Sequence, residues 1–141
     1  MSDVTADMQV REELLMQAWM RADKSAMRPF LRGDFTMIVG TKPPQLLDRP
    51  SFLEACQTRF RCYGFRFGEA YGRQHKKLAW FAAGVELEMQ LAGREWKGAF
   101  WLADLWRKSA FGGWKLCERS LSRAEDDEGF SHAVERLQLW K

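Results

Sequence analysis

The sequence predicts an α+β domain in which helices cover the concave face of a curved antiparallel sheet. Three observations predict this class. The chain has 141 residues, the length of one domain with one core. Helical periodicity prevails before residue 60, whereas long alternating segments prevail over residues 63–123. No low-complexity linker divides the chain, so we expect a single domain over residues 1–141, with a helical extension at about 125–141.

The first expected element is an amphipathic helix from about Asp7 to Ala22. Leu15 and Trp19 lie at helical spacing on its apolar side, and Glu12 is assigned with the other charged residues to its polar side. The apolar side is expected to pack against the sheet.

A second, shorter helix is expected within residues 23–34. Pro29 lacks a backbone N–H and is tolerated only near a helix start, a condition that Ser25 as the N-cap would meet. The first strand should follow at residues 35–40, FTMIVG, where apolar and β-branched residues gather.

A third helix is expected at residues 48–60, because Ser51 and Glu54 have the spacing of a capping box. From Tyr63 onward, alternation predicts four long strands that are joined by short turns. The expected strands cover residues 63–73, 77–91, 94–108 and 114–123.

The two-residue turn Ala92-Gly93 predicts a register for the central hairpin, with Leu91 opposite Arg94. This register places Glu88 opposite Lys97, an opposite-charge pair, and Phe81 opposite Asp104. One face of the hairpin is then almost wholly apolar, with Asp104 as its exception. Because burying an unpaired carboxylate costs several kcal/mol, Asp104 should be paired, neutral or next to a cavity.

The other face of the hairpin becomes apolar away from the turn. It is too apolar to leave in contact with water on a monomer. We therefore expect a homodimer interface there. Its expected residues are Trp80, Ala82, Trp101, Ala103 and Leu105.

Composition excludes several classes. The three cysteines are Cys56, Cys62 and Cys117; they form no CxxC pair, and we expect neither a disulfide framework, a metal site nor a cofactor. No apolar run is long enough to span a bilayer, and the first residues do not have the pattern of a secretory signal, so a cytoplasmic location without a membrane partner is expected. Arginines alternate with aromatics over residues 59–73, but this is ordinary for a half-buried strand, and no nucleic-acid partner is expected.

Two segments carry a resemblance to a known family. They are AWMRADKSAMRPFLRGDFTMIVG and FWLADLWRKSAFGGWKLCERSLSR. In their order and spacing they resemble the nuclear transport factor 2-like superfamily, the cone-shaped fold of SnoaL-like polyketide cyclases and ketosteroid isomerase. The resemblance implies a dimer through the sheet and a pocket between the sheet's concave face and the helices. The pocket residues it implies here are Leu15, Trp19, Val39, Tyr63, Phe81, Phe100, Leu102 and Asp104.

The resemblance also bears on chemistry. Asp104 falls where ketosteroid isomerases keep a protonated Asp that donates to an enolate oxygen. The positions of that family's base and partner tyrosine fall near Val39 and Leu15, which are apolar, and an acid without a base does not move protons between carbons. The limonene-epoxide-hydrolase branch would require an Asp-Arg-Asp set, for which only Asp104, Arg119 and Asp34 are candidates.

Three functions follow as alternatives. The first is a dimeric module whose pocket binds a small, largely apolar molecule. The second is a SnoaL-like isomerase, dehydratase or cyclase with Asp104 as its catalytic acid. The third is a non-catalytic association domain whose cone is filled by its own side chains. In the structural reading of Asp104, the carboxylate accepts from Arg107 or Arg119, from a Trp N–H or from backbone groups, and the turn SAFGG leaves open whether Arg119 or Glu118 faces it. A cavity below roughly 300 Å³ would favour the third.

Overall fold

The computed structural model describes residues 3–125 and 129–140. Its helices are α1 (Asp3–Met20), α2 (Lys24–Met27), the 3₁₀ turn η1 (Arg28–Phe30), α3 (Arg49–Gln57) and α4 (Phe130–Glu135). Its strands are β1 (Leu31–Val39), β2 (Gln45–Asp48), β3 (Phe60–His75), β4 (Leu78–Leu91), β5 (Arg94–Lys108) and β6 (Trp114–Arg123). The α+β class is confirmed.

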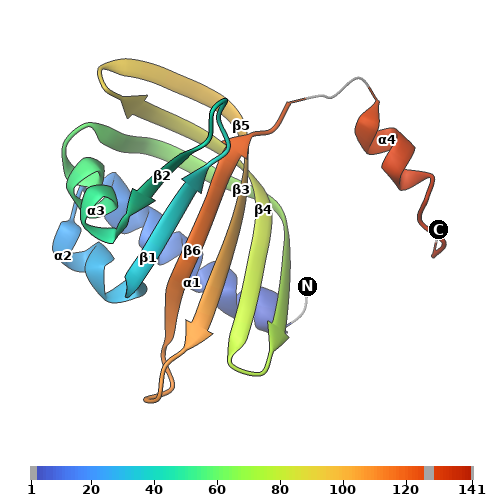
Figure 1. The fold of residues 1–141 in the computed structure, drawn as a ribbon, viewed down its shortest axis with the longest axis horizontal. Coiled ribbons are helices and arrows are strands. Elements are labelled where there is room, and N and C mark those ends of the chain that lie inside the picture. The colour runs from blue at the N-terminus through green and yellow to red at the C-terminus, as the bar shows by residue number, and fades with distance from the viewer. Residues whose placement is uncertain (1–2, 126–128, 141) are drawn as a thin grey trace.

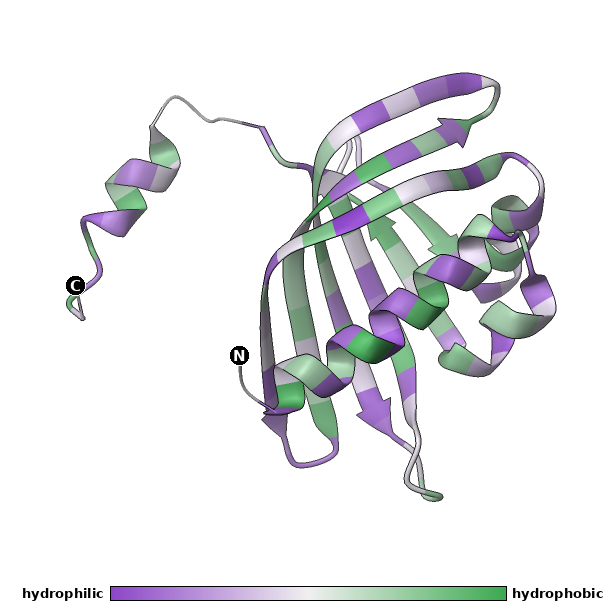
Figure 2. Ribbon diagram, turned by 180° about the vertical axis from the view of Figure 1, so that it is seen from behind, coloured by the Kyte–Doolittle hydropathy of each residue, from purple (hydrophilic) through white to green (hydrophobic). Residues whose placement is uncertain are grey.

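The six strands form one curved, open sheet in the order β2-β1-β6-β5-β4-β3 (Figure 1). All neighbours are antiparallel except β1 and β6, which are parallel, so the expected antiparallel sheet is mixed at this one pair. The sequence carries no local signal for this pair, because its two strands are joined by most of the chain rather than by a turn. α1 lies across one face of the sheet (Figure 2).

The inner face, which α1 and α3 cover, carries the core. Every second residue of β4 from Phe81 to Met89 is buried there, as period-two alternation requires. α1 is fixed at both ends: Trp19 Nε1 donates to the Phe60 carbonyl at 2.7 Å, and the Gly72 N–H donates to Thr5 Oγ1 at 3.0 Å. A Cβ at residue 72 would lie 2.9 Å from Thr5 Cα, so this close approach requires glycine.

The predicted register of the central hairpin is confirmed. Leu91 lies opposite Arg94 and Phe81 lies opposite Asp104. Glu88 lies opposite Lys97, with their charged atoms 4.0 Å apart. Both turn residues, at 92 and 93, have positive φ, which is the type I′ geometry of two-residue hairpins.

Two helix caps differ from those expected. Asp23, not Ser25, caps α2, because its carboxylate accepts the Ala26 N–H at 3.0 Å. The helical segment then ends at Phe30, and β1 begins at Leu31 rather than at residue 35. Asp48, not Ser51, caps α3 by accepting the Ser51 N–H at 3.0 Å. In each case an aspartate two or three residues earlier supplies the acceptor.

The C-terminal helix α4 is shorter than the extension expected at 125–141, of which residues 126–128 and 141 lie outside the described residues. α4 is separated from the sheet in both ribbon views (Figures 1 and 2). Among the helices of the described chain, none has the length and apolar content needed to cross a bilayer.

Candidate functional site: a buried carboxylate–arginine cluster

Asp104 lies on the inner face of β5 and is 2% exposed. Its Cα partner on β6 is Arg119, which is equally buried. Arg119 Nε donates to Asp104 Oδ1 at 3.1 Å, and Arg119 Nη2 donates to Oδ2 at 2.9 Å. Both oxygens of the carboxylate therefore accept from one planar guanidinium, in the bidentate geometry that makes such pairs strong.

A second carboxylate reaches the same guanidinium from α1. Glu12 is fully buried, and its Oε2 accepts from Arg119 Nη2 at 3.0 Å. Its Oε1 accepts from the indole N–H of Trp106 on β5 at 2.9 Å. We call Glu12, Asp104, Trp106 and Arg119 the buried cluster. Its side-chain hydrogen bonds link α1 to the paired strands β5 and β6.

The cluster holds two carboxyl groups and one guanidinium. Burial raises the pKa of Glu12 well above its ordinary value of 4.5, and the nearby Asp104 carboxylate raises it further, against the opposing effect of Arg119. Burial alone would lower the pKa of Arg119, but Asp104 and Glu12 outweigh it and hold the guanidinium charged. The arrangement therefore favours a charged Arg119 and a protonated Glu12.

This protonation state predicts how stability depends on pH. Because the pKa of Glu12 is higher in the folded state, the folded chain retains a proton that the unfolded chain releases above 4.5. The contribution is fully present below that value and is lost as pH rises through the folded pKa, with a slope of at most about 1.4 kcal/mol per pH unit. Urea denaturation of wild type and Glu12→Gln from about pH 5 to pH 8 measures it. We expect the fall in unfolding free energy to be absent from the variant; equal slopes in both proteins would contradict a protonated Glu12.

The buried thiols do not add a nucleophile to the cluster. Burial raises the pKa of Cys62 to about 11 and that of Cys56 further still. Both therefore remain thiols at neutral pH, and thiols are poor nucleophiles and metal ligands. Within the described chain, no group of three His, Cys, Asp or Glu side chains is arranged to hold a metal ion.

The residues expected to line a pocket have two different placements. Leu15, Trp19, Phe81, Phe100 and Leu102 are between 0 and 6% exposed and belong to the same packed core. Val39 is half-buried against that core. Tyr63 is not brought to Asp104: it is 51% exposed and lies on the other face of β3.

Three surface hollows lie over β3, β4 and β5 towards the Ala92-Gly93 turn. Their volumes are about 360, 190 and 480 Å³. Tyr63 lines two of them, in the first beside Arg59 and Arg61. Neither Asp104 nor any other member of the buried cluster forms part of the walls of these three hollows.

Sequence comparison places the chain in no family: no protein-family model matches it, and no curated protein matches it. Solved structures do match. An NTF2-like protein from Cytophaga hutchinsonii aligns with a TM-score of 0.76 at 14% identity, over 88% of this chain and 100% of that one. The chain has the nuclear transport factor 2-like fold. The resemblance that the sequence indicated is thus confirmed at the level of the fold.

Two further structures have names that refer to different activities. A domain from Exiguobacterium sibiricum, provisionally assigned as a Ca/calmodulin-dependent kinase II association domain, aligns with a TM-score of 0.74 at 17% identity, over 90% of this chain and 98% of that one. A ketosteroid isomerase-like protein from Erwinia carotovora atroseptica aligns with a TM-score of 0.66 at 16% identity, over 89% of this chain and 100% of that one. The nuclear transport factor 2-like fold is thus shared by proteins of different function, as is usual for common folds.

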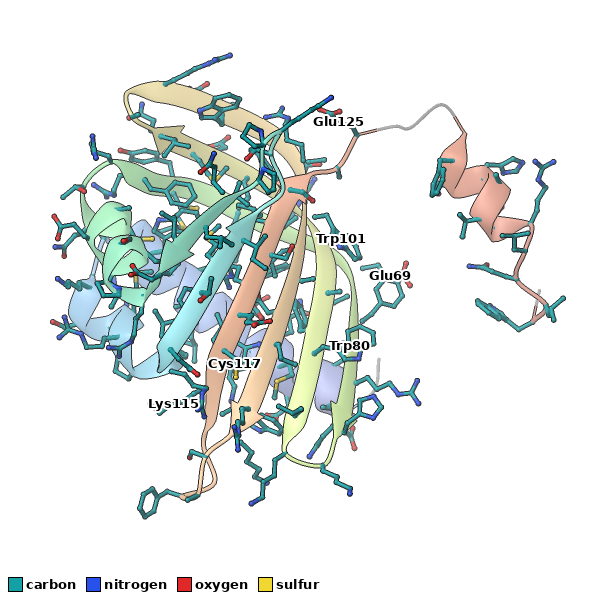
Figure 3. All side chains as sticks on the ribbon, viewed as in Figure 1. Glu69, Trp80, Trp101, Lys115, Cys117 and Glu125 are labelled. Atoms are coloured by element: carbon teal, nitrogen blue, oxygen red, sulfur yellow. The ribbon has the colours of Figure 1, made fainter. Side chains whose placement is uncertain are left out.

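The outer face of this nuclear transport factor 2-like sheet carries apolar residues that are exposed to solvent. Trp80 and Trp101 are 39% and 41% exposed and point away from the helices (Figure 3). Ala82, which lies between them, is 7% exposed, and Ala103 and Leu105 are half-buried. Tyr71 and Leu78 extend the same surface across β3 and β4 and are 49% and 41% exposed. We call these seven residues the outer patch.

Sequence reasoning assigned neither Glu12 nor Trp106 to the site. Glu12 was missed because its charge assigned it to the polar side of α1. The signal was available: Glu12 follows Met8 by four residues and precedes Leu15 and Trp19 by three and seven. Those spacings place it inside the apolar stripe of the helix, where the structure has it. A charged residue at a core position of such a helix indicates a buried partner.

Proposed function

We propose that the chain is a non-catalytic association domain that forms a homodimer through the outer patch. The observation that supports this most is the opposite placement of its aromatic and charged residues. Trp80 and Trp101 face outward, whereas Asp104, which would have to serve a substrate, has both carboxylate oxygens occupied by Arg119. Large half-exposed indoles in one patch are typical of protein interfaces.

The packing of the inner face supports the same choice. The side chains that would contact a small apolar ligand are packed against one another in one core. A ligand the size of a small drug needs about 300 Å³ or more, so admitting one there would require core side chains to move. The pocket module and the SnoaL-like enzyme both depend on such space beside Asp104.

The cytoplasmic location also stays a prediction.

Trp101→Glu tests the association. The substitution removes an indole anchor from the apolar interface and leaves a desolvated carboxylate there, so we expect self-association to weaken by about 30-fold or more. Sedimentation velocity over a concentration series measures it, with circular dichroism to verify folding. Phe111→Ser is the matched control, because Phe111 is fully exposed in the β5–β6 turn, away from the outer patch. A wild-type chain that stays monomeric at high concentration would refute the proposal.

A further inference from the structure

Near the C-terminus, the structure describes a segment with exposed apolar side chains. Residues 129–140, which we call the arm, contain the six-residue helix α4. Phe130, Val134 and Leu137 follow one another at spacings of four and three, so they share one face of the segment. The large apolar side chains of the arm are exposed: Phe130 by 65%, Val134 by 41%, Leu137 by 75%, Leu139 by 97% and Trp140 by 79%.

Such a segment is not stable alone in water. Isolated helices of fewer than about 12 residues are marginal because nucleation costs more than a few hydrogen bonds return. A six-residue helix therefore depends on packing of its apolar face. The arm has that face, which is exposed in the part of the chain that the structure describes, and α4 stands apart from the sheet (Figure 1).

The chain leaves the sheet at the border of the outer patch, a few residues before the arm. The Ala124 N–H donates to the Ala99 carbonyl at 3.0 Å, directly after β6 ends. Ala99 precedes Trp101 by two residues and so lies on the same outer face of β5. Glu125 accordingly lies at the Trp101 end of the sheet (Figure 3). The chain thus leaves the domain beside the surface through which we propose it dimerises.

The outer patch is smaller than the area that a stable dimer usually buries, and the arm can supply the difference. Three strands about 4.8 Å apart and seven residues of about 3.3 Å rise cover roughly 330 Å². A stable dimer usually buries about 800 Å² on each partner, so the patch alone supplies less than half of that area. The five apolar side chains of the arm supply area of the missing size, since a large aromatic alone carries about 150–250 Å².

We propose that the arm packs on the second copy of the chain, so that the two subunits of the dimer exchange arms. This inference rests on the proposed dimerisation. Once the second copy covers the outer patch of the first, the arm of the first copy cannot pack there. The second copy then lies next to the end of β6, where the chain leaves the sheet, so the arm packs on that copy. A two-fold axis then makes the exchange reciprocal, and each copy both gives and receives one arm.

The full-length double variant Leu137→Ser/Trp140→Ser tests the exchange against wild type and the Phe111→Ser control. We expect its dimer dissociation constant to rise at least about tenfold while its circular dichroism and that of the control stay unchanged. An unchanged dissociation constant in the double variant, with wild type still dimeric, would overturn arm exchange and leave the proposed function standing. Monomeric wild type would instead refute the dimer itself.

Hydrogen exchange distinguishes exchange between copies from folding back. If the arm packs on a second copy, protection of the amides at residues 130–140 rises with protein concentration, in step with the dimer fraction. Protection that is the same in dilute and concentrated samples would place the arm on its own domain and overturn the proposal. Protection that rises in wild type and is lost in the double variant supports it.

Discussion

Replacement of Arg119 by methionine is expected to lower the free energy of unfolding by about 3–5 kcal/mol. Arg119 is the only cation that the buried cluster contains, and it is bonded to Asp104 and Glu12 at once. Methionine preserves much of the volume but leaves Asp104 without its donors at a site that is 2% exposed. A loss of this size is a large part of the total stability of a small domain.

The control for this change is Arg107→Met, since Arg107 is an exposed arginine on the neighbouring strand. Urea denaturation should show little change for it. The triple variant Glu12→Gln/Asp104→Asn/Arg119→Met removes both carboxylates together with the guanidinium, and it should recover part of the loss because no charge stays buried. If Arg119→Met costs no more than Arg107→Met, the cluster does not stabilise the fold.

The central hairpin shows what the sequence was able to predict. A two-residue turn with Gly93 admits few geometries, and period-two alternation leaves one register that keeps Asp104 and Phe81 on the apolar face. Whether Arg119 or Glu118 faces Asp104 was left open. The reason is the bulge between Leu105 and Trp106, which shifts the β5–β6 register in a way that counting back from the glycine-containing turn does not reveal.

The resemblance placed Tyr63 in the pocket, and a bulge explains why it is not there. Period-two alternation from Phe65 and Phe67 would assign Tyr63 to the inner face, but a bulge between Cys62 and Gly64 adds one residue. Cys62 and Phe65 both remain inside, and Tyr63 turns outward. Bulges and the parallel β1–β6 pair depend on contacts between distant segments, and single-sequence periodicity does not report such contacts.

Substitution of Asp104 by asparagine is expected to destabilise the fold by about 2 kcal/mol, less than the loss of Arg119. The variant keeps the shape of the side chain, but an amide nitrogen replaces one of the two oxygens that accept from Arg119. Glu12 limits the damage, because it already accepts from Arg119 Nη2 and becomes the sole charge partner of the guanidinium once it ionises. The cluster then changes from two carboxyls and one cation to a one-to-one pair.

This exchange of roles predicts a second observable in Asp104→Asn. Without the Asp104 carboxylate, one cause that raises the pKa of Glu12 is gone while Arg119 still lowers it, so the folded pKa of Glu12 falls towards 4.5. The unfolding free energy of the variant should therefore fall less with rising pH than that of wild type. Urea denaturation at about pH 5, 6.5 and 8 measures both effects, with the exposed Glu118→Gln on β6 as the matched control. If Asp104→Asn is as stable as Glu118→Gln and keeps the pH dependence of wild type, Asp104 does not stabilise the fold. Its carboxyl group would then be available to a ligand.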